Sequence, residues 1–127
     1  MEVFELTGCT IKGIYSCVPS RSEDNLARCR EIYKDEKKAA SVVKATGINF
    51  RRVIDQNNSS LDLCVRAAEK LLADVGVDKQ EIGAVVNVTF TPERIMPCNA
   101  CQAQHRLGLL TDVAAFDINL ACSGWVY

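Results

Sequence analysis

The chain has 127 residues, of which 48% are hydrophobic and 24% are charged, and 15 basic residues against 16 acidic ones leave a formal net charge of -1. This composition is typical of one globular domain and predicts no nucleic-acid partner. The first residues lack a basic stretch followed by a long apolar run, and no run approaches the ~18 apolar residues of a membrane span. We therefore expect a cytoplasmic protein with no membrane partner.

The seven cysteines are an odd number and are scattered through stretches that have helix and strand patterns. Because no secretory signal is recognised before them, the sequence predicts reduced thiols and no disulfide framework. Basic residues gather at Arg51, at Arg52 and within residues 34–38. Acidic residues lie among these lysines, so the cluster indicates a solvated helix face, with an anion site as the alternative.

The first half of the chain predicts strands and then two helices. Residues 3–7 alternate apolar with polar and residues 10–18 are rich in β-formers, which indicates one or two strands. Ser22 is expected to cap a helix, and a second helix ends near Gly47 in a left-handed cap. A loop is expected over residues 48–58.

The clearest predicted helix covers residues 59–75. Ser59 and Asp62 form a pattern like a capping box at its start, and Gly76 ends it. Its apolar residues recur at helical spacing and indicate one buried stripe. This stripe consists of Leu61, Cys64, Val65, Ala68, Leu72 and Val75.

The second half alternates strand and helix. Residues 84–90 are so apolar and β-branched that they indicate a central strand of a parallel sheet covered on both faces. Pro97 opens a helix over residues 98–107, and residues 113–119 form the next buried strand. This alternation predicts an α/β fold with a mainly parallel sheet and helices on both faces.

Cys122 follows the last of these strands in a sharp turn, and its neighbours Ala121, Ser123 and Gly124 are small. A thiol at the first turn of a helix faces unpaired backbone N–H groups and the positive end of the dipole, which favour the thiolate. Small neighbours let a thioester carbonyl approach, as in other strand-to-helix nucleophile turns. Cys122 is therefore a candidate nucleophile, and a buried inert cysteine is the alternative.

Four stretches occur in order and at compatible spacings, and together they resemble the N-terminal part of 3-ketoacyl-acyl carrier protein synthase III, a thiolase-fold condensing enzyme. They are residues 11–19 (IKGIYSCVP), 46–52 (TGINFRR), 97–108 (PCNACQAQHRLG) and 115–124 (AFDINLACSG). The resemblance implies a thiolase-like α/β fold of which this chain is an incomplete N-terminal half. Residues 1–127 would be one domain truncated just after the Cys122 turn, with the C-terminal half absent.

The resemblance also implies a ping-pong condensation. Cys122 would accept an acyl group from a coenzyme A or carrier-protein thioester, and malonyl-acyl carrier protein would lose carbon dioxide and attack that group. The backbone N–H of Cys122 would help to hold the oxyanion. Family members need no cofactor, and their catalytic histidine and asparagine belong to the C-terminal half. The implied partners are acyl carrier protein and a second copy of the chain, paired through residues 113–119.

Three further positions are implied to bind substrate. Thr46 and Arg51 match the family pattern and would contact the pantetheine thioester, and Met96 stands where the family often has a phenylalanine that lines the partner subunit's acyl pocket. At Met96, interface packing is the alternative. Ser41 and Ala45 replace a tryptophan and an arginine that contact coenzyme A in well-known members, so an acyl carrier protein is the alternative to coenzyme A as acyl donor.

The helix after Pro97 carries Cys98, Cys101 and His105 on one face, a donor set that suits Zn²⁺. No fourth ligand is marked by spacing, so we expect no metal, and small-residue packing is the preferred interpretation, ahead of zinc and of a regulatory disulfide. Asp117 and Asn119 are expected to fix backbone and not to take part in catalysis. A non-catalytic thiolase-fold partner in a lipid or polyketide pathway, and a small metal-binding module, are the other functions considered.

Overall fold

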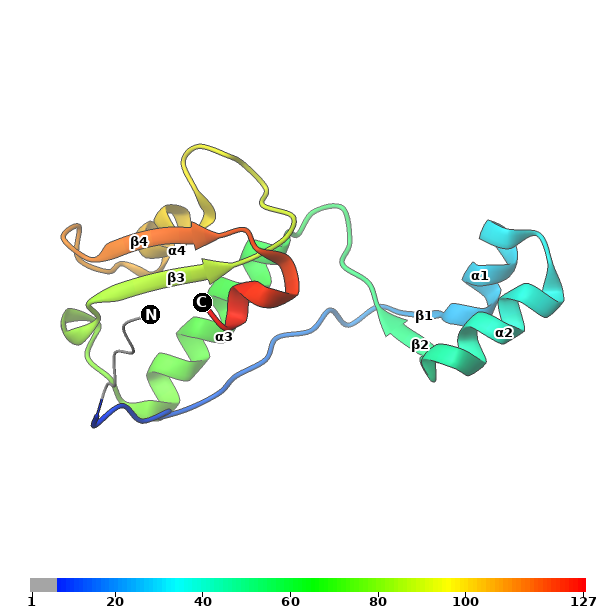
Figure 1. Cartoon of the computed structure of the whole chain (residues 1–127). Coiled ribbons are helices and arrows are strands. Elements are labelled where there is room, and N and C mark those ends of the chain that lie inside the picture. Colours follow the sequence, from blue (N-terminus) through cyan, green and yellow to red (C-terminus); the bar gives the residue numbers. More distant parts are fainter. Residues whose placement is uncertain (1–6) are drawn as a thin grey trace, which may run out of the picture. The chain divides into compact units, whose positions relative to one another are not determined.

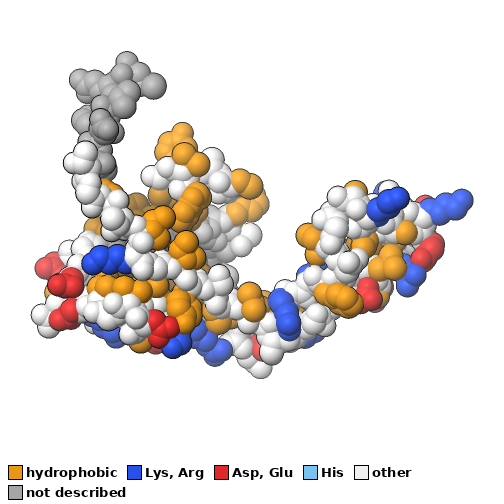
Figure 2. Space-filling model, turned by 90° about the horizontal axis from the view of Figure 1, so that it is seen from below, with side chains coloured by type: hydrophobic (Ala, Val, Ile, Leu, Met, Phe, Trp, Pro, Cys, Tyr) orange, Lys and Arg blue, Asp and Glu red, His pale blue; other side chains and the backbone are white. Residues whose placement is uncertain are grey.

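The computed structural model describes residues 7–127, which form two compact units (Figures 1 and 2). The smaller unit is Val18–Leu63, and the larger one joins the residues up to Cys17 with Cys64–Tyr127. No helix in the described part of the chain is both long and apolar enough to cross a bilayer. The elements are β1 (Ser22–Asp24), α1 (Asn25–Tyr33), α2 (Glu36–Thr46), β2 (Phe50–Arg52), α3 (Ser60–Val75), a 3-10 turn (Lys79–Glu81), β3 (Ala84–Val88), α4 (Asn99–Leu107), β4 (Ala114–Ile118) and a second 3-10 turn (Ala121–Trp125).

The smaller unit is a helical hairpin attached to a short antiparallel ribbon. β1 pairs with β2, and α1 and α2 enclose a core of Cys29, Ala39 and Val43. The carboxylate of Asp24 accepts a hydrogen bond from the Ala27 N–H at 3.0 Å and caps α1.

Two predictions for this unit are wrong and one is confirmed. Ser22 begins β1 and does not cap the helix. The loop expected over residues 48–58 contains β2, because three of its residues find a partner strand that is distant in the sequence. The left-handed end of α2 is confirmed, since Gly47 has φ 69° and its N–H donates to the Val43 carbonyl.

α3 starts and ends as predicted. The carboxylate of Asp62 accepts from the Ser59 N–H at 2.6 Å, and the Asp62 N–H donates to the Ser59 hydroxyl at 3.2 Å, so the capping box is reciprocal. Gly76 ends the helix with φ 68°. Leu61 and Val65 are buried, whereas Cys64, which was placed on the buried stripe, is exposed.

The larger unit is built on a β3–α4–β4 crossover. β3 and β4 pair in parallel, with Val86 opposite Phe116, and α4 packs on this sheet through Ala100 and Ala103, both buried. The other face is open, since Val86 and Phe116 are 46% and 47% exposed. The parallel α/β arrangement is confirmed, but β3 is not covered on both faces within residues 7–127.

The N-terminal segment departs from the predicted strands. Residues 3–6 lie outside the described part, and residues 10–18 form no strand, because no neighbouring strand pairs with them there. The segment instead packs on α3: a Cβ added at Gly13 would lie 2.7 Å from Leu71 Cδ1 and 2.9 Å from Val75 Cγ2. Gly13 is thus required for close approach rather than for strand formation.

A hydrogen bond also ties this segment to α3. The Tyr15 hydroxyl donates to the carboxylate of Asp74, and the Lys70 ammonium lies 2.7 Å from the other carboxylate oxygen. The hydrogen bond from Lys70 is the larger cause, and that from Tyr15 the next, of the lowered pKa of Asp74. A carboxyl whose pKa is lowered by folding stabilises the native state above its unfolded pKa of about 3.9, and this contribution disappears as the pH falls through the folded pKa.

Tyr15→Phe is therefore expected to raise the pKa of Asp74 toward its ordinary value, and Lys70→Met is expected to raise it further. The pKa is measured by NMR titration of the Asp74 carboxyl. Tyr33→Phe is the matched control, because that ring lies in the smaller unit beneath the Lys38 ammonium. An unchanged titration of Asp74 in Tyr15→Phe would contradict the contact.

Candidate active site

The turn after β4 contains a residue in an unusual backbone conformation. Ala121 has φ 48°, in the left-handed region that a residue with a Cβ rarely adopts. The chain reverses there between the end of β4 at Ile118 and the 3-10 turn that begins at Ala121. Strain of this kind costs of order 1–3 kcal/mol and persists only where the surrounding structure holds it. We call residues 119–125 the Cys122 turn.

Hydrogen bonds and one close contact hold this turn. The Ser123 hydroxyl donates to the Leu120 carbonyl at 2.7 Å, and the Val126 N–H donates to the Ser123 carbonyl at 3.0 Å. Gly124 is buried against the sheet, where an added Cβ would lie 2.7 Å from Val88 Cγ1 and 3.4 Å from a methyl group of Ile118. The absence of a side chain at Gly124 therefore lets the turn lie on the β3–β4 pair.

Cys122 lies immediately after the strained residue and is exposed. It stands beyond the carboxyl end of β4, the edge of a parallel sheet at which ligands bind in open α/β folds. The predicted helix start is a 3-10 turn in the structure. An exposed thiol in this position can attack the electrophilic carbonyl of a thioester.

Asp117 connects the sheet to the start of α4. Its carboxylate accepts from the Asn99 N–H at 3.0 Å and from the Ala100 N–H at 2.8 Å. These are two of the N–H groups that a helix start leaves without intrahelical partners. Asp117 therefore has the structural role that was expected, while Asn119 is exposed.

The predicted substrate residues are divided between the two units. Met96 and Cys122 are both in the larger unit. Met96 is 82% exposed, and a cis peptide bond joins it to Pro97. Thr46 and Arg51 are in the smaller unit. The Thr46 hydroxyl donates to carbonyls in the last turn of α2, at 3.0 Å to Val42.

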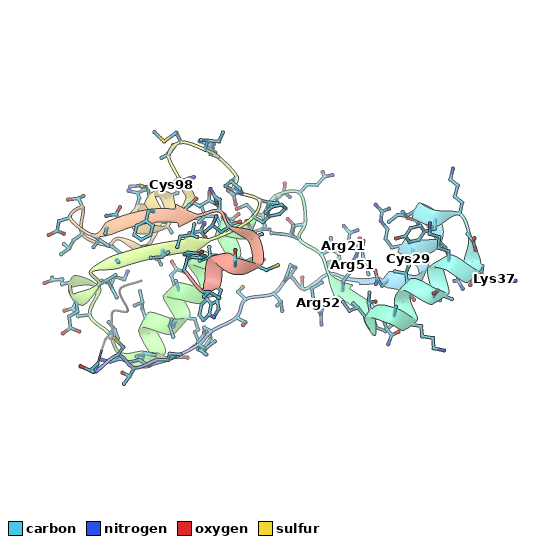
Figure 3. The ribbon with its side chains drawn as sticks, viewed as in Figure 1. Arg21, Cys29, Lys37, Arg51, Arg52 and Cys98 are labelled. Atoms are coloured by element: carbon cyan, nitrogen blue, oxygen red, sulfur yellow. The ribbon has the colours of Figure 1, made fainter. Side chains whose placement is uncertain are left out.

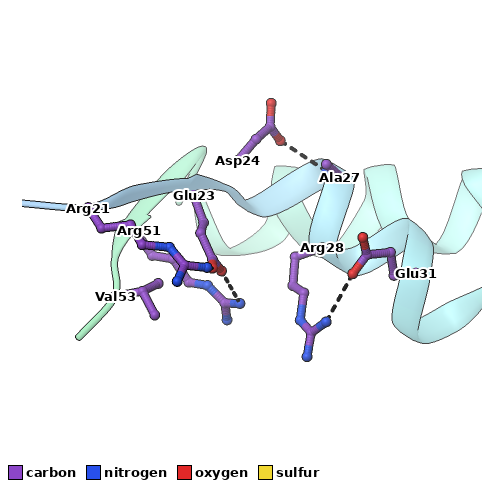
Figure 4. A pocket seen from close by; sticks show the side chains of 8 residues that line it. All are labelled: Arg21, Glu23, Asp24, Ala27, Arg28, Glu31, Arg51 and Val53. Carbon is purple, nitrogen blue, oxygen red and sulfur yellow. Dashed lines mark hydrogen bonds and ion pairs between the residues drawn. The ribbon is translucent and has the colours of Figure 1, made fainter. Parts of the chain in front are cut away.

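Arg51, labelled in Figure 3, lies on β2 opposite Glu23 of β1, and its guanidinium is 3.1 Å from the Glu23 carboxylate (Figure 4). Arg21 pairs with the same carboxylate. Hydrogen bonding from Arg51 is the main cause that lowers the pKa of Glu23. Arg52 points elsewhere, because it donates to the Ser20 carbonyl at 2.6 Å.

An open groove of about 570 Å³ surrounds this pair in the smaller unit (Figure 4). Its charged lining was not predicted as a site, because Arg21 and Glu23 lie far from Arg51 in the sequence and meet only through the β1–β2 pairing. The lining residues are Arg21, Glu23, Asp24, Ala27, Arg28, Glu31, Arg51 and Val53. Acidic and basic groups balance in this set, so the groove is not a strongly cationic anion site.

The possible zinc ligands do not gather into a site. The sulfurs of Cys98 and Cys101 are 3.4 Å apart, and His105 is exposed in the last turn of α4. Among residues 7–127, no group of three or more histidine, cysteine, aspartate or glutamate side chains is placed to hold a metal ion.

Comparison with known proteins finds sequence relatives and solved structures that resemble this chain. No protein-family model matches the chain. It is similar to the beta-ketoacyl-[acyl-carrier-protein] synthase III of Enterococcus faecalis, at 46% identity over 82 residues, which are 65% of this chain and 25% of the relative. The protein of the same name from Bartonella tribocorum is 32% identical over 117 residues, 92% of this chain and 35% of the relative. The chain thus spans a quarter to about a third of the length of these relatives.

Solved structures agree in fold. A 3-oxoacyl-(acyl-carrier protein) synthase from Burkholderia xenovorans is 42% identical with a TM-score of 0.78, over 87% of this chain and 31% of that one. A 3-oxoacyl-(acyl-carrier-protein) synthase III gives 0.77 at 35% identity, over 92% of this chain and 34% of that one. OleA of Xanthomonas campestris gives 0.76 at 22% identity, over 91% of this chain and 37% of that one, a likeness of fold alone. The predicted thiolase-like α/β fold is confirmed.

Proposed function

We propose that this chain, a homologue of the beta-ketoacyl-[acyl-carrier-protein] synthases III, is the N-terminal part of an enzyme that condenses an acyl thioester with malonyl-acyl carrier protein. The product would serve fatty acid or polyketide biosynthesis. The observation that carries the proposal is the Cys122 turn, in which a strained Ala121 presents an exposed thiol beyond the end of β4.

In the proposed reaction the Cys122 sulfur attacks the carbonyl carbon of the acyl thioester, and the carrier thiol leaves with a proton. The backbone N–H of Cys122 would donate to the oxyanion that forms on the carbonyl oxygen. Malonyl-acyl carrier protein would then lose carbon dioxide, and its carbanion would displace the Cys122 sulfur from the acyl group. No resident cofactor is needed, because the thioester and the loss of carbon dioxide drive the chemistry.

Thr46, Arg51 and Met96 complete the proposal as substrate-binding residues. Thr46 and Arg51 would contact the pantetheine part of the thioester, and Met96 would line the acyl pocket. The exposure of Met96 supports this role, since a flexible thioether accommodates chains of different shape. Acyl carrier protein and a second copy of the chain would be the partners, in the cytoplasm.

The test is acylation of the protein expressed from the complete open reading frame that contains these residues. Incubation with acetyl-coenzyme A, with a longer acyl-coenzyme A and with an acyl-acyl carrier protein should add one acyl group per chain from at least one donor, and peptide mass spectrometry should place it on Cys122. Cys122→Ser should lose this thioester adduct entirely. Cys64→Ser, which changes another exposed thiol, should keep it.

Absence of any adduct on a protein whose circular dichroism and melting are native would overturn the enzymatic proposal. The chain would then be the non-catalytic thiolase-fold partner considered from the sequence. An adduct distributed over several of the seven thiols would also contradict a specific nucleophile, because it would show only that exposed cysteines react.

A further inference from the structure

Two cysteines lie in contact where α4 begins (Figure 3 labels the first). Cys98 is the residue before the helix, with an extended backbone of φ -64° and ψ 160°, and Cys101 lies one turn later. Their sulfurs are 3.4 Å apart, and both residues are partly buried. A Cys-x-x-Cys arrangement at a helix start brings two thiols close enough to form an intramolecular disulfide.

The contact can close to a covalent bond with little rearrangement. A disulfide has an S–S distance of about 2.05 Å, so the two sulfurs must approach by roughly 1.4 Å. Because Cys98 precedes the helix, its side chain can turn without disturbing the intrahelical hydrogen bonds. The first of these, from the Gln102 N–H to the Cys98 carbonyl, involves only backbone atoms.

The surroundings do not favour a thiolate at this pair. The Asp117 carboxylate already binds the N–H groups of Asn99 and Ala100, which would otherwise attract a negative sulfur. The hydrogen bond with Cys98 and then burial raise the pKa of Cys101. A dithiol whose thiolate is not stabilised gives a disulfide that resists reduction, in contrast to strongly oxidising Cys-x-x-Cys proteins.

We propose that Cys98 and Cys101 form a dithiol site that is oxidised to an intramolecular disulfide by exchange with a small-molecule disulfide. The thiolate of one cysteine attacks a sulfur of the reagent, and the first small thiolate leaves with the bonding electron pair. The second cysteine, after losing its proton, attacks the protein sulfur of the mixed disulfide. The S–S bond to the small molecule breaks, and the second small thiolate leaves. The protein loses two protons and two electrons, and the reagent is reduced to two thiols.

The bond would link the end of the loop that holds Met96 to the first turn of α4. Cys98 is two residues after Met96, and the Cys101 sulfur lies 3.7 Å from the Ala115 carbonyl of β4. Closure would remove the Cys101 S–H that donates to this carbonyl, so the bond fixes the start of α4 to the residue before it and not to β4. The inference depends only on the thiol pair and holds whether or not Cys122 is a nucleophile.

The experiment uses oxidised glutathione and the protein expressed from the complete open reading frame that contains these residues. After exposure, free thiols are alkylated and the chain is cut with trypsin, which releases residues 95–106 with both cysteines and no other. The expected product is this peptide two hydrogens lighter and unalkylated, formed about tenfold faster or more than any other internal disulfide. Cys101→Ala should leave only a mixed disulfide on Cys98, and Cys64→Ser should close normally.

Two outcomes would overturn the proposal. One is glutathione adducts on Cys98 and Cys101 without closure in the native chain. The other is equal closure in native and urea-unfolded chain, which would show that sequence spacing and not the folded contact brings the thiols together. As a second measurement, the closure rate should keep rising above pH ~8.5, where an ordinary thiol is half ionised, because the pKa of Cys101 is raised.

Discussion

Replacing Gly124 by alanine is expected to lower the free energy of unfolding by about 1–3 kcal/mol, as overpacking of a filled site does. The added methyl group would lie 2.7 Å from Val88 Cγ1, closer than real carbon contacts allow. Because β3 is held by its pairing with β4, the turn is the part that moves. Cys122 should therefore be displaced from the edge of the sheet, and its acylation should slow more than the loss of stability alone explains.

Gly83→Ala is the matched control, since an added Cβ there meets no atom within 4 Å. Both variants are compared by urea denaturation and by the rate of thioester formation at Cys122. Equal stability and equal acylation in the two variants would show that the packing of Gly124 on Val88 does not hold the turn in place.

Local signals made much of the fold predictable. The reciprocal Ser59–Asp62 cap, the glycines that end α2 and α3, and the strand β4 all depend on residues that are close in the sequence. The four motifs then supplied the thiolase-like fold, which local patterns do not specify. Their order and spacing carried information about the arrangement of whole elements.

Non-local contacts account for the errors. β2 was assigned to a loop because its three residues carry no period of their own and become a strand only opposite β1. Residues 10–18 have strand-like composition, yet they lie along α3, where Gly13 permits close packing against Leu71. β-propensity describes a fit to a sheet surface, and it does not decide the structure of a segment that packs on a helix instead.

The turn that contains Cys122 was predictable from the sequence, whereas its backbone conformation was not. Small residues on both sides indicated a tight turn, but a left-handed φ at Ala121 has no sequence signal, since glycine or asparagine is the usual residue there. Arg51 was expected to face a substrate, and the structure adds its ion pair with Glu23. For Arg51 to bind an anionic group, its ion pair with Glu23 would have to break, or its guanidinium would have to contact both groups at once.

Asp117→Ala is expected to lower the free energy of unfolding by about 2–4 kcal/mol, because it removes a carboxylate that accepts two backbone hydrogen bonds. The N–H groups of Asn99 and Ala100 belong to buried residues and would lose their partner. Since a buried unpaired donor carries its full desolvation cost, the start of α4 should fray. Amide hydrogen exchange at these two residues should accelerate before that of the rest of the helix.

Asp117→Asn separates charge from geometry, because an amide oxygen can still accept one of the two bonds while its NH₂ group cannot accept the other. The free energy of unfolding of Asp117→Asn should lie between that of the wild type and that of Asp117→Ala. Asp112→Ala, at an exposed aspartate before the same strand, controls for the change in net charge. Unchanged amide exchange at Asn99 and Ala100 in Asp117→Ala would mean that other groups cap α4. Asp117 would then not be the residue that joins β4 to this helix.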